Sequence, residues 1–249
     1  MRANADMAFK SRASVPAGTR VYAIGDSHGC AGPLKRLQEQ RLSESSAEAA
    51  ELERRVIVYL GDYIDRGPDS RGLIDRLIDA PLPGFESVFL KGNHDAMLLR
   101  LIDEGVAGPS WALHGLFETL ESYGIDPALW HSGAAALRAT VVEAVPARHL
   151  AFLRALRHSH IEGDYFFAHA GVRPGVPLEA QSPRDLMWIR DEFLDSNADH
   201  GKIVVHGHTP VEAPDLCNNR IGIDTGAVYG GALTALALEG TERRFLQVR

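Results

Sequence analysis

The feature that most constrains the fold is a repeated pattern in which a short apolar run stops at a polar residue. The first three runs cover residues 21–24, 55–60 and 87–90, and they end at Gly25-Asp26, Gly61-Asp62 and Gly92-Asn93. Short runs rich in β-branched and aromatic residues predict strands, and the near-continuous hydrophobicity of 55–60 predicts a buried one. Apolar spacing of helical period follows at 34–42 and 70–79. Strand, loop and helix therefore alternate, which predicts an α/β fold.

The second half of the chain predicts a helical insertion followed by more strands. Residues 96–160 have a helical period broken by Gly and Pro. Strand patterns then return at 164–168, 202–205, 220–223, 232–238 and 243–248. Residues 1–18 lack a clear period and are predicted to be a flexible leader, and 43–53 is predicted to extend a solvated helix. We therefore expect one domain over 19–249, with two sheets and a helical cap inserted at about 96–160.

Composition limits the class of protein and its partners. The chain has 249 residues, is 45% hydrophobic and carries a formal net charge of −7, which disfavours general binding to nucleic acid or to an anionic membrane. Cys30 and Cys217 lie far apart without metal-finger spacing, which favours a reduced intracellular protein and leaves a single bridge open. No apolar run has the length of a signal peptide or a membrane span. We expect a cytoplasmic protein.

The polar side chains at the strand ends are candidate metal ligands. Any one of them alone would be a turn residue or a capped imidazole. Their recurrence matters because open α/β sheets bind ligands outside the carboxyl ends of their strands. Carboxylate, amide and imidazole donors without thiolates suit Mn²⁺, Fe or Zn²⁺, and one carboxylate can bridge two ions roughly 3.5–4 Å apart. The pattern predicts a dinuclear hydrolytic site, and the guanidinium of Arg66 suits bidentate binding of a phosphoryl group.

Taken in order, five motifs resemble the signature of the phosphoprotein phosphatase family, which belongs to the calcineurin-like metallophosphoesterases. The motifs are Gly25-Asp26-Ser27-His28-Gly29, Gly61-Asp62-Tyr63-Ile64-Asp65-Arg66-Gly67, Gly92-Asn93-His94-Asp95, His169-Ala170-Gly171 and His206-Gly207-His208-Thr209. They run from about residue 21 to 238. The resemblance implies a four-layer β-sandwich flanked by helices, with two metal ions at its loops.

The resemblance also implies a role for each motif residue. The implied metal ligands are Asp26 and His28 for the first ion, Asp62 as the bridge, and Asn93, His169 and His208 for the second. His206 stands beside His208 as the other member of a doublet. His94 matches the family's general acid and Asp65 the carboxylate that orients it, while Arg66 and Arg190 match arginines that bind the substrate phosphate together with Asn93. Two divalent ions are implied, with Mn²⁺ placed first.

The motifs point to two substrate classes. Protein phosphatases of this family have Glu where this chain has Asp95, and symmetrical diadenosine tetraphosphate hydrolases have Asp there. Those nucleotide hydrolases usually lack the acid found here as Asp65, which is the protein-phosphatase form. We expect a serine/threonine protein phosphatase that also acts on small phosphoesters, by direct attack of a metal-bridging hydroxide. The alternatives are a symmetrical diadenosine tetraphosphate hydrolase and a metal-dead module that binds phosphopeptides.

Other conspicuous residues are predicted to be structural. Trp111, Trp130 and Trp188 are expected to pack in the core or the cap and not to stack on bases, because no basic patch surrounds them in the sequence. Cys30 is expected to fill a small buried apolar position. His114 belongs to no recognised motif and is expected at the surface. The sequence predicts no oligomeric state.

Overall fold

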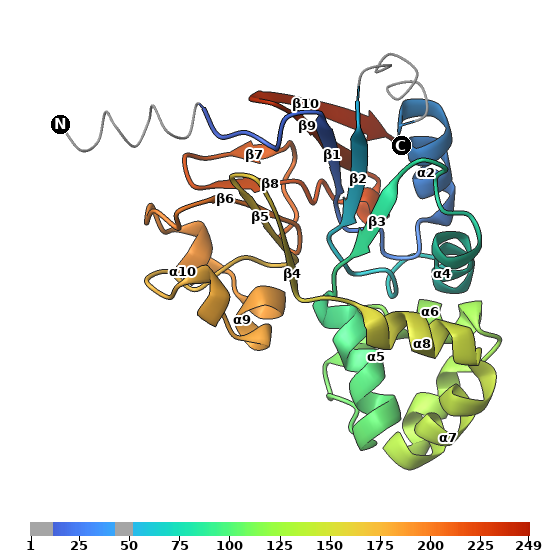
Figure 1. Cartoon of the computed structure of the whole chain (residues 1–249). Coiled ribbons are helices and arrows are strands. Elements are labelled where there is room, and N and C mark those ends of the chain that lie inside the picture. Colours follow the sequence, from blue (N-terminus) through green and yellow to red (C-terminus); the bar gives the residue numbers. More distant parts are fainter. Residues whose placement is uncertain (1–11, 43–51) are drawn as a thin grey trace.

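The computed structural model describes residues 12–42 and 52–249 and contains two five-stranded sheets that face each other (Figure 1). The first sheet has the order β10-β9-β1-β2-β3 and the second the order β4-β5-β6-β8-β7. The first consists of β1 (Thr19–Ile24), β2 (Arg54–Tyr59), β3 (Glu86–Phe89), β9 (Leu233–Glu239) and β10 (Glu242–Val248). The second consists of β4 (Ser159–Glu162), β5 (Tyr165–Ala168), β6 (Ile203–His206), β7 (Asp215–Leu216) and β8 (Arg220–Gly222).

The strands that carry the predicted motifs are parallel to one another. β1 pairs with β2 and β2 with β3 in parallel register, while β5 pairs with β6 and β6 with β8 in the same way. Strands β9 and β10 of the first sheet, and the edge strands β4 and β7 of the second, join their neighbours antiparallel. Because the parallel strands of a sheet all end at one edge, the loops after them lie together at that edge.

Alternating side chains divide the interior into separate layers. In β1, Val21 and Ala23 face the second sheet, whereas Tyr22 and Ile24 face the helices on the other side. Strand β5 follows the same period of two, with Phe167 between the sheets and Phe166 outside. Both sheets are thus covered on both faces, which explains the continuous hydrophobicity of their central strands.

Helices cover the outer faces of both sheets and complete four layers. The first sheet is covered by α2 (Ala31–Arg36), η1 (Leu37–Leu42) and α4 (Ser70–Asp79), and the second by α9 (Pro183–Trp188) and α10 (Asp191–Leu194). In Figure 1, α9 and α10 lie beside the second sheet, while α2 and α4 lie on the far side of the first. This arrangement confirms the predicted α/β sandwich flanked by helices.

The predicted cap is a helical subassembly that shares a core with the first sheet's outer helices. It consists of α5 (Asn93–Glu104), η2 (Trp111–His114), α6 (Leu116–Ser122), η3 (Pro127–Ser132), α7 (Ala134–Ala144) and α8 (Ala147–Ala155). Its predicted limits of 96 and 160 were wrong at both ends. α5 begins at Asn93 because the Asp95 carboxylate caps it by accepting the Gly92 N–H. Residues 159–160 belong to strand β4, where they pair with residues 167–168 of β5.

Residues 12–18 are not part of a flexible leader, so that prediction was wrong for the portion the structure describes. Ala13 and Val15 are buried between the two sheets. The Val15 amide donates to the Gly240 carbonyl, and the Ser14 amide donates to the Asp164 carboxylate. Too few residues alternate here for a period to be recognised in the sequence. The remainder of the predicted leader, 1–11, and residues 43–51 of the predicted helix extension lie outside the described residues.

Two expectations from composition meet direct observations. Both cysteines are free, and Cys30 is buried, so the bridge that the sequence left open is absent from this structure. Across residues 12–42 and 52–249, no helix has the length and apolar character needed to cross a membrane.

We expect Phe167→Ala to lower the free energy of unfolding by about 3–5 kcal/mol, because it removes a fully buried ring between the sheets. Phe245→Ala is the matched control, since this ring packs half-buried against the same core and should cost about 1–2 kcal/mol. Urea unfolding followed by circular dichroism measures both. Equal losses for the two variants would contradict the placement of the core.

Candidate metal centre

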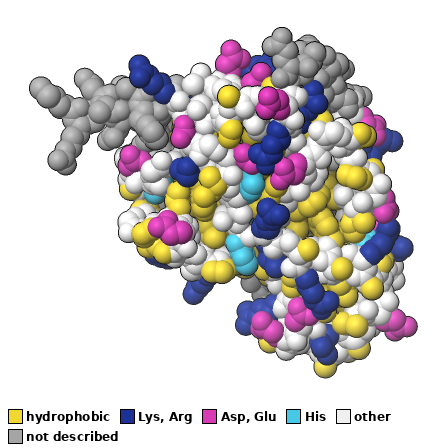
Figure 2. Space-filling model, in the orientation of Figure 1, with side chains coloured by type: hydrophobic (Ala, Val, Ile, Leu, Met, Phe, Trp, Pro, Cys, Tyr) yellow, Lys and Arg dark blue, Asp and Glu magenta, His cyan; other side chains and the backbone are white. Residues whose placement is uncertain are grey.

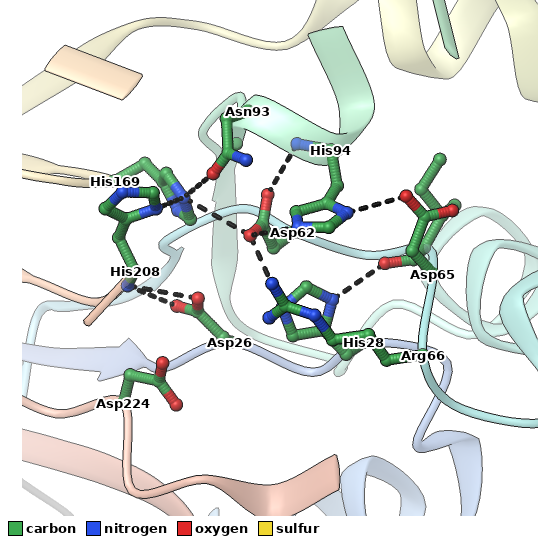
Figure 3. Close-up of polar contacts among 12 residues, drawn as sticks. Asp26, His28, Asp62, Asp65, Arg66, Asn93, His94, His169, His208 and Asp224 are labelled. Atoms are coloured by element: carbon green, nitrogen blue, oxygen red, sulfur yellow. Dashed lines mark hydrogen bonds and ion pairs between the residues drawn. The ribbon is translucent and has the colours of Figure 1, made fainter. Parts of the chain in front are cut away.

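The loops after six parallel strand ends converge on one buried polar cluster (Figure 3). From the first sheet come Asp26 after β1, Asp62 after β2, and Asn93 and His94 after β3; from the second come His169 after β5, His208 after β6 and Asp224 after β8. All of them are buried. The structure therefore brings together side chains that lie up to about 200 positions apart in the sequence.

The backbone at this cluster is strained in a way found nowhere else in the described residues. The non-glycine residues with positive φ are His28, Asp62, Asp65, Arg66 and His208, with φ between 37° and 71°. Such conformations are costly for residues with a Cβ and persist only where the surroundings enforce them, commonly at functional sites. The strain thus independently marks motif residues that the sequence singled out.

Two glycines of the motifs are explained by close contacts to carboxylates. A Cβ on Gly92 would lie 2.0 Å from Asp62 Oδ1, and a Cβ on Gly207 would lie 1.9 Å from Asp26 Oδ1. Any side chain at either position would push a carboxylate out of the cluster. The glycines are therefore required for the loops to approach each other.

Backbone carbonyls determine which imidazole nitrogens face the cluster. His169 Nδ1–H donates to the Leu60 carbonyl at 3.0 Å, and His28 Nδ1–H donates to the Ile64 carbonyl at 2.8 Å. In a neutral imidazole Nε2 then carries a lone pair. Both Nε2 atoms lie 3.4 Å from Asp62 Oδ2, and His169 Nε2 is also 3.0 Å from Asn93 Oδ1. Acceptors that converge in this way favour a positive charge between them: against the effect of burial, the carboxylates of Asp62 and Asp26 raise the pKa of His169 to about 9.

The donor atoms form two groups that share Asp62. His28, Asp62 and His94 make one group, and Asp62, His169 and His208 make the other, with the ligand atoms in each within 4.8 Å of one another. His208 Nε2 is buried, and no hydrogen-bond partner for it lies among the described residues. An orphaned buried nitrogen next to a carboxylate that belongs to both groups fits a pair of divalent cations.

The electrostatics of the cluster are those of a site that favours positive charge. Burial and the neighbouring Asp224 raise the pKa of Asp26, and burial with the charge of Asp62 raises the pKa of Asp95 to about 7. Burial also lowers the pKa of His28 to about 3 and that of His208 to about 2, so both rings are neutral at pH 7. Neutral imidazoles and mutually repelling carboxylates are suitable metal ligands.

Asp26 lies at the edge of the cluster and is in neither donor group of the described residues. Its Oδ2 and Oδ1 accept the His208 backbone N–H at 3.0 and 3.2 Å, which ties the loop after β1 to the loop after β6. The predicted pairing of Asp26 with His28 on one ion is therefore not reproduced as a close side-chain group. Asp26 joins the two sheets and leaves part of its carboxylate facing the cluster.

The geometry separates the two members of the histidine doublet. His206 is buried and packs edge-on against Phe193 of α10, with ring centroids 5.1 Å apart. His208 turns the other way, and its Nδ1 lies 3.2 Å from His169 Nε2. Only His208 reaches the donor groups.

His94 is held by an extensively bonded carboxylate. Its Nδ1–H donates to Asp65 Oδ2 at 2.6 Å, and its Nε2 faces the cluster 4.0 Å from Asp62 Oδ2. Asp65 also accepts from Trp111 Nε1 at 2.6 Å and from Thr119 Oγ1 at 2.7 Å. The predicted pair of His94 and Asp65 is therefore present, with Nε2 free to exchange a proton with a ligand.

Two donors to Asp65 were not found from the sequence. Trp111 is buried as predicted, but its indole N–H also orients Asp65, and Thr119 reaches Asp65 from α6. Both belong to the cap, where spacing relative to the motifs gives no signal. Asp224 was also missed as a cluster residue, although it follows a predicted strand in the same manner as the other candidates.

The predicted phosphate-binding arginines both place positive charge near histidines of the cluster. Arg66 Nη1 donates to His28 Nε2 at 2.7 Å, and its Cζ lies 5.7 Å from the centre of the Tyr229 ring. Arg190 is exposed, and its charge contributes to lowering the pKa values of His208 and His114. His114, predicted to be a surface residue, is exposed but its ring centroid lies 6.5 Å from that of His94. Near the cluster, the side chains of Arg66, Arg190 and His114 therefore supply N–H groups that can donate hydrogen bonds to an anion.

Asp95 supports the cluster through backbone hydrogen bonds and belongs to neither donor group of the described residues. Its carboxylate accepts from the backbone N–H groups of Gly92, Asp62 and Tyr63 at 2.9, 3.0 and 3.1 Å. It thereby fastens the Asp62 loop to the first turn of α5. The position at which the two substrate classes differ therefore shapes the loop and contributes no atom to the donor groups.

Comparisons with known proteins agree with this geometry. The family model described as calcineurin-like phosphoesterase matches residues 19–231. A bis(5'-nucleosyl)-tetraphosphatase PrpE [asymmetrical] of Bacillus thuringiensis is 28% identical over 228 residues, covering 86% of this chain and 88% of the relative. A protein of the same name from Bacillus anthracis is 29% identical over 225 residues, with the same coverage.

Solved structures show the same fold in enzymes with different descriptions. The crystal structure of a candidate diadenosine tetraphosphatase has a TM-score of 0.60 at 23% identity and covers 94% of this chain and 99% of its own. A serine/threonine phosphatase of Saccharomyces cerevisiae has a TM-score of 0.52 at 15% identity and covers 99% and 87%. These likenesses support the architecture. Because the family model spans most of the chain and all of its motifs, the protein belongs to the calcineurin-like phosphoesterase family of metal-binding hydrolases.

Proposed function

We propose that the protein is a dinuclear-metal-dependent hydrolase of dinucleoside tetraphosphates, which it cleaves at a phosphoanhydride bond. The observation that carries the proposal is a cation-demanding donor cluster in a chain whose similar relatives are named bis(5'-nucleosyl)-tetraphosphatases. Those relatives are named asymmetrical, so we propose unequal cleavage to a nucleoside monophosphate and a nucleoside triphosphate. This places the nucleotide substrate ahead of the phosphoprotein that the sequence favoured.

The proposed ligands are the residues that converge at the strand ends. They are Asp26, His28, Asp62, Asn93, His169 and His208, with Asp62 shared between two ions. When bound, two divalent ions, with Mn²⁺ as first choice and Fe or Zn²⁺ as alternatives, lower the pKa of coordinated water and neutralise phosphoryl charge. The backbone carbonyls of Leu60 and Ile64 keep the proper nitrogens of His169 and His28 aimed at the ions.

The remaining side chains act on the phosphate chain itself. Arg66 and Arg190 bind non-bridging oxygens, and the planar guanidinium gives each a bidentate contact. Asn93 adds an amide contact from the start of α5. His94 donates a proton from Nε2 to the leaving oxygen, while the hydrogen bond from Nδ1 to Asp65 keeps the ring oriented.

A serine/threonine protein phosphatase is the second candidate, and the pair of His94 and Asp65 favours it. An alkoxide leaves poorly without a proton, whereas a nucleoside phosphate is a much better leaving group. A carboxylate that accepts three hydrogen bonds to orient one imidazole suits the harder of these two reactions. We expect the same site to hydrolyse small phosphomonoesters as well.

We further propose that residues 12–249 form one catalytic domain, with the helices from α5 to α8 as its cap. This is supported by the shared core between the cap and the helices over the first sheet. We propose a cytoplasmic location because both cysteines are unpaired, as is usual in a reducing compartment. The proposed partner is an anionic small molecule, without nucleic acid or membrane.

We expect a higher kcat/KM for diadenosine tetraphosphate than for a phosphothreonine peptide when both are measured on one Mn²⁺-loaded preparation. Chromatography should identify AMP and ATP as the products, in place of two molecules of ADP. An enzyme sample treated with a chelator is the blank. The comparison separates the two substrate classes because both use the same metal ligands.

A preference for the peptide would overturn the nucleotide proposal and support the second candidate. Release of ADP alone would contradict unequal cleavage while leaving the substrate class intact. If a sample that binds metal hydrolyses neither substrate, the result would favour a module that recruits phosphorylated ligands without cleaving them.

We expect His94→Asn to lower kcat for a phosphothreonine peptide by about 10²–10⁴-fold, the usual contribution of a general acid. The loss should be much smaller for p-nitrophenyl phosphate, whose leaving group hardly needs a proton, and intermediate for diadenosine tetraphosphate. His131→Asn in the exposed part of the cap is the matched control. An equal loss on all three substrates would show that His94 serves as a ligand or a structural residue.

A further inference from the structure

Two hollows lie along the segment 108–115, whose Trp111 donates to Asp65, the partner of His94. The first has a volume of about 480 Å³ and is lined by Met97, Arg100 and Trp188 among others. The second, of about 300 Å³, is lined by Arg66 and Tyr229 among others. Residues 108 and 110 line the first hollow and 113–115 the second, with Trp111 buried between them against Asp65. The segment that carries Trp111 therefore lines both hollows.

The first hollow, which we call the Trp188 pocket, shares helix α5 with the metal centre. Residues 93, 96, 97 and 100 of α5 share one helical face, so the wall of the pocket extends from Asn93 along that face. The opposite wall comes from α9, where Trp188 stands two residues before Arg190. The lining of this pocket therefore begins one helical turn from Asn93, a proposed metal ligand.

The chemistry of the Trp188 pocket is aromatic and cationic. Trp188 keeps 44% of its surface exposed, so the expectation that it packs in the core or the cap was wrong, although the two side chains before it in α9 are buried. Arg184 stands on the same helix, and among the described residues it has no ion-pair partner. Within residues 12–42 and 52–249, the ion pair of Arg100 is with Glu104 at 3.2 Å, in an exposed contact that is readily exchanged. Figure 2 shows histidine and basic side chains close together among hydrophobic ones near the middle of this face.

We propose that the Trp188 pocket binds one nucleoside of the substrate, with the base stacked on the indole and the arginines contacting the phosphate chain. This rests on the proposed function and names its specificity site. A half-exposed indole with a cation beside it is the combination that holds an unpaired base next to an anionic chain. The volume lies within the usual range for small-molecule sites.

The second hollow supports the same type of ligand. Tyr229 is 63% exposed there and lies against Arg66, so an aromatic ring and a cation again occur together. A dinucleoside polyphosphate has a base at each end of an anionic chain, which matches the presence of two separate aromatic surfaces, at Trp188 and at Tyr229. A phosphothreonine peptide needs only one of these two aromatic surfaces and has no base to stack on it.

The test compares Trp188→Ala, Trp188→Phe and the control Trp130→Ala on the metal-loaded enzyme. Trp130 packs on the cap core outside the pocket lining and receives the same substitution. We expect Trp188→Ala to raise KM for diadenosine tetraphosphate about tenfold or more, the size expected for the loss of one base stack. Its kcat/KM on p-nitrophenyl phosphate should stay unchanged, and Trp188→Phe should restore most of the affinity.

A second readout separates this inference from the proposed function. AMP and inorganic phosphate are titrated by calorimetry into chelated wild-type and Trp188→Ala proteins, where hydrolysis does not occur. Wild type should bind AMP more tightly than phosphate, and Trp188→Ala should lose that difference. If wild type cleaves diadenosine tetraphosphate and Trp188→Ala does so with an unchanged KM, the pocket assignment is wrong and the proposed function stands.

If wild type fails to cleave the nucleotide, the proposed function fails, and the AMP titration still decides the pocket. Equal affinity of wild type for AMP and phosphate would overturn the pocket assignment. A Trp188→Ala defect confined to phosphopeptides would overturn it too, and would reassign the pocket to peptide side chains.

Discussion

The carboxylate of Asp62 is the interaction on which the rest of the site depends. It is the one member common to both donor groups of the described residues, so it converts two separate clusters into a centre for two cations. Its backbone is left-handed at φ 52°, and Asp95 holds its amide while Oδ1 accepts the His94 N–H at 3.0 Å. The strain and burial of this one charged residue persist because the first turn of α5 holds its amide and its carboxylate, while its carbonyl accepts the His28 N–H at 2.8 Å.

The fold positions Asp62 among the other donor residues by packing two sheets together through an apolar core. Val58 of β2 and Phe167 of β5 belong to the same inter-sheet cluster, so the strands that precede Asp62 and His169 are packed against each other. The parallel order within each sheet then aligns the loops at one edge. Catalytic and binding side chains stand on loops, but the loops begin at rigid strand ends, which limits how far the donor atoms can separate.

The sequence predicted those parts of the molecule in which a local pattern and a three-dimensional role coincide. Continuous apolar runs before Asp26 and Asp62 located the central strands and the residues after them, and the fold class followed. Local pattern could not reveal Trp111 or Thr119, because their contact with Asp65 depends on how the cap folds back. Short strands such as β7, and the buried segment at Val15, are too brief to show a period.

The central claim is that this cluster binds two divalent ions through Asp62. The most direct test is the metal content of wild type and Asp62→Asn after dialysis against Mn²⁺, measured by mass spectrometry, with Asp126→Asn in the exposed cap as the matched control. The account predicts two ions per chain in wild type and in the control, and at most one in Asp62→Asn. Fewer than one ion in wild type, or two ions retained in Asp62→Asn, would contradict it.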